Sequence, residues 1–257
     1  MATGIRQNQY LRSIVTAMQS VEANWAALSA LERCQQISTA VVAALRAVYV
    51  PEPRLEVANL GGGLNGQFDF GPWVLKVNTS MAIGNVHQTA NQRKEVIAKL
   101  GDVIMHEARH CEQWWRMARL TVARMRAKGL MPSVSALSGQ LPGVSINILQ
   151  RAVGAPPLTP IEVPETEPWY ESVYGGGSSF REINVMGRNL RPTGGRFAEV
   201  GQQFQQSEFA RYQRGLAEEE DAHQAGREIQ TMFLQGSGVL PQQLSGHRPI
   251  AQGVVRY

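Results

Sequence analysis

The chain lacks the features that mark a secreted disulfide-bonded protein or a membrane protein. It has only two cysteines among 257 residues, Cys34 and Cys111, and no CxxC motif surrounds either. This excludes a disulfide framework and favours reduced thiols. The longest apolar stretch, residues 41–50, contains Arg46 and is far too short to span a membrane. No Sec-type signal peptide precedes the first helical pattern, so we expect a soluble protein made in the cytoplasm. Export by a route that needs no such signal stays open.

Other absences narrow the class further. No internal repeat is found, and no residue type is enriched enough for a fibrous or low-complexity chain. Hydrophobic residues make up 43% of the sequence, which excludes a disordered chain. The length suits one sizeable domain or two small ones, and we expect a single domain over residues 1–257. The net charge of +4 permits an anionic partner without requiring one.

Hydrophobic periodicity predicts an α+β fold that is predominantly α. Residues 1–50 have apolar positions at helical spacing, which predicts two helices. Within residues 54–128, weak alternation predicts a strand near 54–60. Strand-forming residues on both sides of Gly71-Pro72 predict a hairpin. The strongest helical pattern follows at 91–128, and Gly101 is a position where this helix is expected to break or kink.

The second half of the chain is less regular. Prolines and short glycine runs predict an irregular excursion with short helical pieces over residues 129–203. A helical pattern resumes over 204–235, and the tail 236–257 is expected to be loosely ordered.

The sequence His106-Glu107-Ala108-Arg109-His110 is an HExxH motif within the long predicted helix. Histidines four residues apart on a helix lie one above the other, so both imidazoles can bind one zinc ion. The glutamate beside the first ligand is suited to accept a proton from water bound to that ion. In a chain with five histidines, a random HExxH is expected only about 0.007 times.

A catalytic zinc usually has three protein ligands and a water, so a third donor is required. A metzincin would have glycine and histidine where this chain has Gln113 and Arg116, which excludes that class. An acidic cluster heads the helical pattern near residue 218, and the stripe below Glu219 is small or apolar. A carboxylate on such a stripe is costly unless a cation neutralises it. Glu218 and His223 remain alternatives, and His87 and His247 are the other histidines.

An HExxH followed by Glu-x-x-Ala on a later helix resembles the gluzincin branch of zinc metallopeptidases. The resemblance covers about a third of the chain. It implies a zincin-like fold in which a small sheet flanks the metal helix and a C-terminal helix carries the third ligand, here Glu219. Gln113, three residues after His110, is similar to the HExxHxxQ form of bacterial effector and toxin-type metallopeptidase domains. The better-known Asn-Glu-x-x-x-Asp form of the second motif is absent.

Supporting roles can be suggested for a few residues. Asp102 or Asp221 could orient an imidazole, although an ordinary surface acid is the slightly favoured interpretation of Asp102. Tyr212 or His223 could stabilise the oxyanion. The strand at residues 73–77 could pair with an extended peptide, or it could be an ordinary structural strand.

Neighbours of the motif are interpreted as packing or surface residues. Cys111 points onto the apolar stripe and is expected to be buried filler. Trp114 and Trp115 are expected to be core or cleft-wall aromatics. Four arginines are expected to form a solvated outer face of the long helix, namely Arg116, Arg119, Arg124 and Arg126.

The leading hypothesis is a zinc-dependent metalloendopeptidase with one Zn²⁺ per chain. His106, His110 and Glu219 would bind the metal, Glu107 would act as the base, and Tyr212 would assist. The substrate would be a protein or peptide. A delivered effector or toxin, with a secretion apparatus or an immunity protein as partner, competes equally with a housekeeping peptidase.

The alternative is a non-catalytic protein in which zinc ties two helices together. Nucleic-acid binding by the arginine face ranks last, because no recognised nucleic-acid motif accompanies it.

Overall fold

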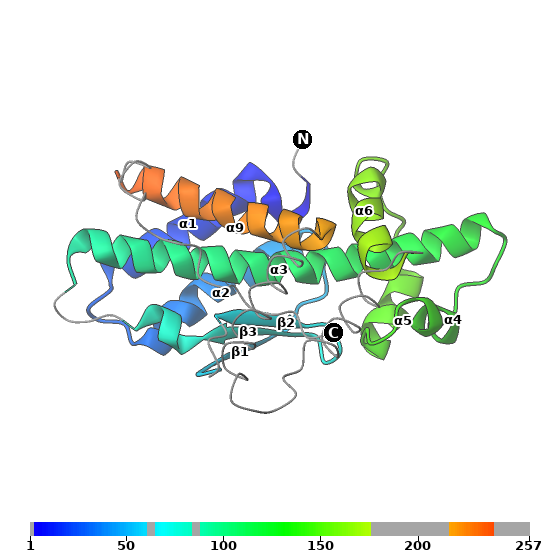
Figure 1. Cartoon of the computed structure of the whole chain (residues 1–257), viewed down its shortest axis with the longest axis horizontal. Helices are drawn as coiled ribbons and strands as arrows, with labels where there is room; N and C mark the ends of the chain where they lie inside the picture. Colours follow the sequence, from blue (N-terminus) through cyan, green and yellow to red (C-terminus); the bar gives the residue numbers. More distant parts are fainter. Residues whose placement is uncertain (1–2, 61–64, 84–87, 176–215, 239–257) are drawn as a thin grey trace, which may run out of the picture. The chain divides into compact units, whose positions relative to one another are not determined.

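The computed structural model describes residues 3–60, 65–83, 88–175 and 216–238 (Figure 1). These residues are mostly helical with one three-stranded sheet, which confirms an α+β fold that is predominantly α. Among the described helices, none has both the length and the apolar character needed to cross a membrane. The helices are η1 (Gly4–Arg6), α1 (Asn8–Ala23), α2 (Ala30–Ala47), η2 (Thr79–Ala82), α3 (Ala90–Ala127), α4 (Val134–Gln140), α5 (Ile146–Gly154), α6 (Glu162–Tyr174) and α9 (Ala217–Gly236).

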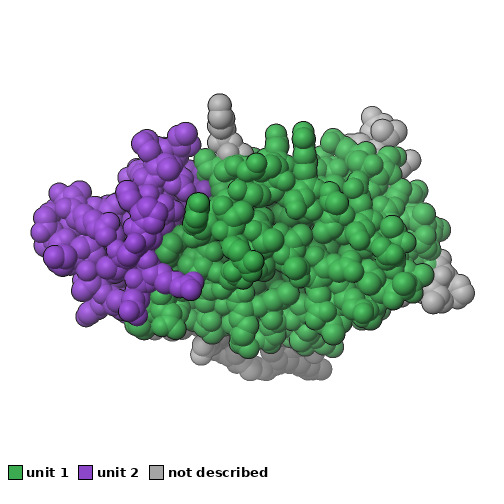
Figure 2. Space-filling model, turned by 180° about the vertical axis from the view of Figure 1, so that it is seen from behind, with its two compact units in different colours: residues 1–115, 144–148, 222–256 green, residues 116–143, 149–221, 257 purple. Residues whose placement is uncertain are grey.

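The chain divides into two compact units, coloured green and purple in Figure 2. The first comprises Met1–Trp115, Val144–Ile148 and Ala222–Arg256. The second comprises Arg116–Gly143, Leu149–Asp221 and Tyr257. The boundary crosses two continuous helices, α3 and α9.

The first unit begins with the two helices predicted for residues 1–50. The start of α2 is fixed by a capping box, in which the Glu32 backbone N–H donates to Ser29 Oγ and the Ser29 N–H donates to the Glu32 carboxylate. The helices bury apolar stripes that include Ile14, Met18 and Ile37. The helical spacing of these apolar residues therefore predicted both elements correctly.

The sheet has the strand order β1-β3-β2. β1 (Arg54–Ala58) pairs in parallel with β3 (Val74–Asn78), and β2 (Gly66–Asp69) pairs antiparallel with β3 as the predicted hairpin. β3 is therefore the central strand. The suggestion that residues 73–77 pair with a substrate peptide is wrong, because both sides of this strand are already hydrogen-bonded.

Helix α3 is 38 residues long, and its residues up to Trp115 belong to the first unit. It lies between the sheet and the helices α1 and α9 (Figure 1). The expected break at Gly101 does not occur, since the helix is assigned continuously through that residue. The predicted apolar stripe is buried, including Ile97, Ile104 and Ala108.

Helix α9 approaches α3 closely at Gly226. A Cβ atom built at Gly226 would lie 2.1 Å from Asp102 Oδ1 and 2.8 Å from the Asp102 carbonyl oxygen. The stripe predicted below Glu219 is buried, with Ala222, Ile229 and Phe233 fully inaccessible. Small residues thus allow the close contact that the sequence pattern predicted.

We expect Gly226→Ala to destabilise the protein by about 1–3 kcal/mol, because the added methyl group meets backbone as well as a side chain of α3. Gly139→Ala on α4 is the matched control, since no atom lies within 4 Å of its added Cβ. Urea unfolding of both variants measures the difference. Equal midpoints for Gly226→Ala and the wild type would show that the helices separate at no cost.

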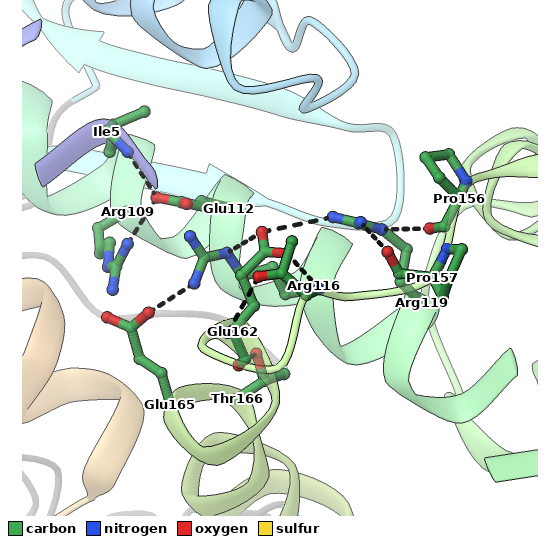
Figure 3. A network of polar contacts seen from close by, with 11 residues as sticks. Ile5, Arg109, Glu112, Arg116, Arg119, Pro156, Pro157, Glu162, Glu165 and Thr166 are labelled. Carbon is green, nitrogen blue, oxygen red and sulfur yellow. Dashed lines mark hydrogen bonds and ion pairs between the residues drawn. The ribbon is translucent and has the colours of Figure 1, made fainter. Parts of the chain in front are cut away.

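In the second unit, two arginines of α3 bind α6 and the segment before it (Figure 3). Arg116 Nη1 donates to Glu165 Oε2 at 2.7 Å, and Arg119 donates to the carbonyl oxygens of Pro156 and Pro157. The predicted solvated face is therefore wrong for Arg116 and Arg119, which are 2% and 8% exposed. Both guanidinium groups are paired within this unit, because a buried guanidinium group is stable only when carboxylate or carbonyl oxygens accept its hydrogen bonds.

Candidate metal centre

The two histidines of the HExxH motif are buried together on one face of α3. His106 is 1% exposed and His110 is fully buried. Their Nε2 atoms lie 3.1 Å apart, and their rings meet edge to face with centroids 4.7 Å apart. The helical spacing of four residues therefore directs both imidazoles to one point, as the sequence predicted.

Gln113 determines how His110 presents its nitrogens. The Gln113 Oε1 atom lies 2.8 Å from His110 Nδ1 and accepts the hydrogen bond from it. A neutral imidazole that is protonated on Nδ1 keeps a lone pair on Nε2, which is the nitrogen that faces His106. The sequence analysis did not predict this contact. The spacing of three residues between His110 and Gln113 is a signal that could have indicated it, because side chains at i and i+3 are neighbours on a helix.

We expect Gln113→Leu to weaken zinc binding about 10–100-fold, because the substitution removes the acceptor that fixes the ring and its tautomer. Gln113→Glu retains an acceptor and should retain the affinity. Competition with a chromophoric chelator measures both variants. Equal affinities for wild type and Gln113→Leu would show that His110 needs no such support.

The geometry of this pair fits zinc. Two nitrogen ligands at about 2.0–2.1 Å from a tetrahedral ion lie roughly 3.3 Å apart, close to the observed 3.1 Å. Imidazole lone pairs that face each other repel unless a proton or a cation lies between them. Two buried Nε2 atoms at this distance are thus suited to a shared cation.

Helix α9 supplies further donors. His223 lies with its ring centroid 4.5 Å from that of His106. Glu219, one turn earlier on α9, is 2% exposed. Potential ligand atoms of His106, Glu219 and His223 all lie within 4.8 Å of one another, and the same holds for His106, Glu107 and His110. The structure thus brings together potential ligands from both predicted helices, and among them is His223, one of the alternatives that the sequence left open. Glu218 is also fully buried, whereas Glu220 is exposed.

The motif glutamate has a partner that the sequence did not reveal. The backbone N–H of Phe68 donates to Glu107 Oε2 at 2.7 Å, and both residues are buried. Phe68 belongs to β2, an edge strand of the sheet, so this bond joins the sheet to α3. An edge strand of the small sheet thus contacts α3, while the zincin-like fold stays a prediction. A backbone donor also favours the ionised form of a carboxylate.

The remaining predicted residues have mixed outcomes. The favoured interpretation of Asp102 as a surface acid is wrong, since it is 7% exposed and adjoins Gly226 of α9. Asp221 is half-buried. Burial raises the pKa of the Cys111 thiol well above its usual range, which agrees with its interpretation as filler. Three residues lie outside the described part of the chain, namely Tyr212, His87 and His247.

Comparisons with known proteins give no match. No family model matches the chain, and neither a curated protein nor a solved structure resembles it significantly.

Proposed function

We propose that the chain is a zinc-dependent metalloendopeptidase of the HExxH type. One observation carries this proposal: two buried imidazole nitrogens, 3.1 Å apart, adjoin the motif glutamate and potential ligands from a second helix. Two groups of three potential ligands share His106, and within each group the ligand atoms lie within 4.8 Å of one another, which is more than packing requires. Buried polar groups are costly unless they are satisfied, and a divalent cation satisfies several of them at once.

The proposed metal ligands are His106 and His110 from α3 and Glu219 from α9. His223, one turn beyond Glu219, is the alternative donor on that helix. When bound, zinc supplies Lewis-acid polarisation of a carbonyl group and lowers the pKa of water. A neutral imidazole pair with one carboxylate matches the ligand types of catalytic zinc in peptidases.

In the proposed reaction Glu107 is the proton carrier. Its carboxylate lies with its oxygen within 4.8 Å of the candidate ligand nitrogens of His106 and His110. The Phe68 N–H holds one carboxylate oxygen and thereby fixes the orientation of the group. Glu107 takes a proton from the attacking water and passes it to the nitrogen of the departing amine.

Metal analysis and a proteolysis assay test the proposal together. We expect close to one zinc per purified chain, and cleavage of an unfolded protein substrate that stops with a chelator and returns when zinc is restored. Zinc-free protein with undiminished cleavage would contradict the proposal.

A second candidate function is a zinc-stabilised binding protein without catalysis, and two observations favour it. Glu107 has a structural use, as acceptor for the Phe68 N–H, that requires no chemistry. The motif residues are also at most 2% exposed, as expected for a closed structural site. This candidate predicts stoichiometric zinc, a large stabilisation by zinc, and no cleavage of any peptide.

A further inference from the structure

The turn η1 near the start of the chain is packed into the first unit. Ile5 is fully buried, and Gly4 has a φ of 59°. This left-handed conformation suits glycine and directs the following N–H group inward. Although the turn is only three residues long, its buried residues therefore belong to the core of the first unit.

One contact of the turn is with α3, close to the metal ligands. The Ile5 N–H donates to Glu112 Oε2 at 3.2 Å, and Arg109 Nη1 donates to the same oxygen at 2.6 Å (Figure 3). Arg109 and Glu112 flank His110 in the sequence and are 0% and 1% exposed. A buried ion pair is stable only when its remaining lone pairs are satisfied, and the Ile5 N–H meets part of that requirement.

A second polar contact of the turn is with α9. Arg6 Nε donates to Glu228 Oε2 at 3.0 Å, and Arg6 Nη2 pairs with Glu228 Oε1. The pair is bidentate, and the Arg6 side chain is only 11% exposed. Glu228 lies on the same helix as His223, a little more than one turn further along.

We infer that residues 4–6 form a positioning strap, which holds α3 and α9 at the separation that zinc binding requires. The inference rests on the proposed zinc site, because it concerns the spacing of the two helices that carry the candidate ligands. Two of its polar contacts are with the two helices that carry the candidate ligands. Zinc, bound by donors from α3 and α9, imposes the same separation. Strap docking and zinc binding are therefore thermodynamically linked, and each must strengthen the other.

Substitutions in the Arg6–Glu228 pair test this linkage in the full chain. Arg6→Ala and Glu228→Gln should each weaken zinc binding roughly tenfold, while Arg6→Lys should lie between them and the wild type. Arg46→Ala is the matched control, since it removes an arginine–glutamate pair at the end of α2. The absorption spectrum of the cobalt-substituted protein should change in Arg6→Ala and not in Arg46→Ala. Zinc should also slow hydrogen exchange at the Ile5 amide.

The outcomes separate the strap from the zinc site. Wild-type protein that binds zinc, with equal affinity and an equal cobalt spectrum in Arg6→Ala and Glu228→Gln, overturns the strap and leaves the proposed function standing. Wild-type protein that binds no zinc overturns both, and this result appears before any substitution is made. Protection of the Ile5 amide that is independent of zinc shows that the turn is only structural, which also overturns the strap.

Discussion

Glu107→Gln is expected to retain zinc and to lose peptidase activity about 10²–10⁴-fold in kcat, the range attributed to a positioned acid–base group. The amide is nearly isosteric, and its oxygen can still accept the hydrogen bond from the Phe68 N–H. The contact between β2 and α3 is therefore preserved, and the substitution removes only the capacity to carry a proton. Metal analysis, thermal unfolding and steady-state kinetics on one preparation measure the three properties together.

Two control variants make this result specific. Glu95→Gln is the same substitution at a half-buried position near the start of α3 and should leave activity unchanged. Glu107→Ala removes the acceptor as well as the proton carrier, so it should also destabilise the protein by about 1–3 kcal/mol through an unpaired buried N–H. Full cleavage by Glu107→Gln would exclude the proposed base. If no variant and no wild-type preparation cleaves any peptide, the zinc-stabilised binding protein becomes the better explanation.

Local patterns explain why much of the site could be predicted. His106 and His110 share a helix, so their convergence follows from the helical repeat alone. The α9 stripe is similarly local: Glu219, Ala222 and Gly226 lie on one face at steps of three and four residues, and all three are buried. The hairpin followed from its turn residues, Gly71 and Pro72.

The features that were missed depend on contacts between distant segments. The bond from Phe68 to Glu107 joins residues 39 apart, and no periodicity encodes the way an edge strand crosses a helix. The central place of β3 depends on a parallel partner, β1, whose pairing a local pattern cannot specify. Arg116 was interpreted as solvated because its carboxylate partner, Glu165, lies 49 residues away. A pattern along one helix cannot show which of its charged residues another element will bury with a counter-ion.

Zinc removal is expected to lower the thermal stability of the protein substantially. A ligand at 1,000 times its Kd stabilises the folded state by about 4 kcal/mol, which corresponds to a Tm shift on the order of 10 °C for a protein of this size. Differential scanning calorimetry with stoichiometric zinc, and again with excess chelator, measures the shift.

Ligand variants then identify the donor on α9. His106→Ala should show the same Tm with zinc as with chelator, because His106 belongs to both groups of candidate ligands. Between Glu219→Gln and His223→Ala, the variant that loses the response to zinc names the third ligand. If both lose it, the ion has four protein ligands, and such a closed site favours the structural candidate over the peptidase. A full zinc-dependent shift in His106→Ala would exclude the proposed metal centre, because His106 belongs to both groups of candidate ligands.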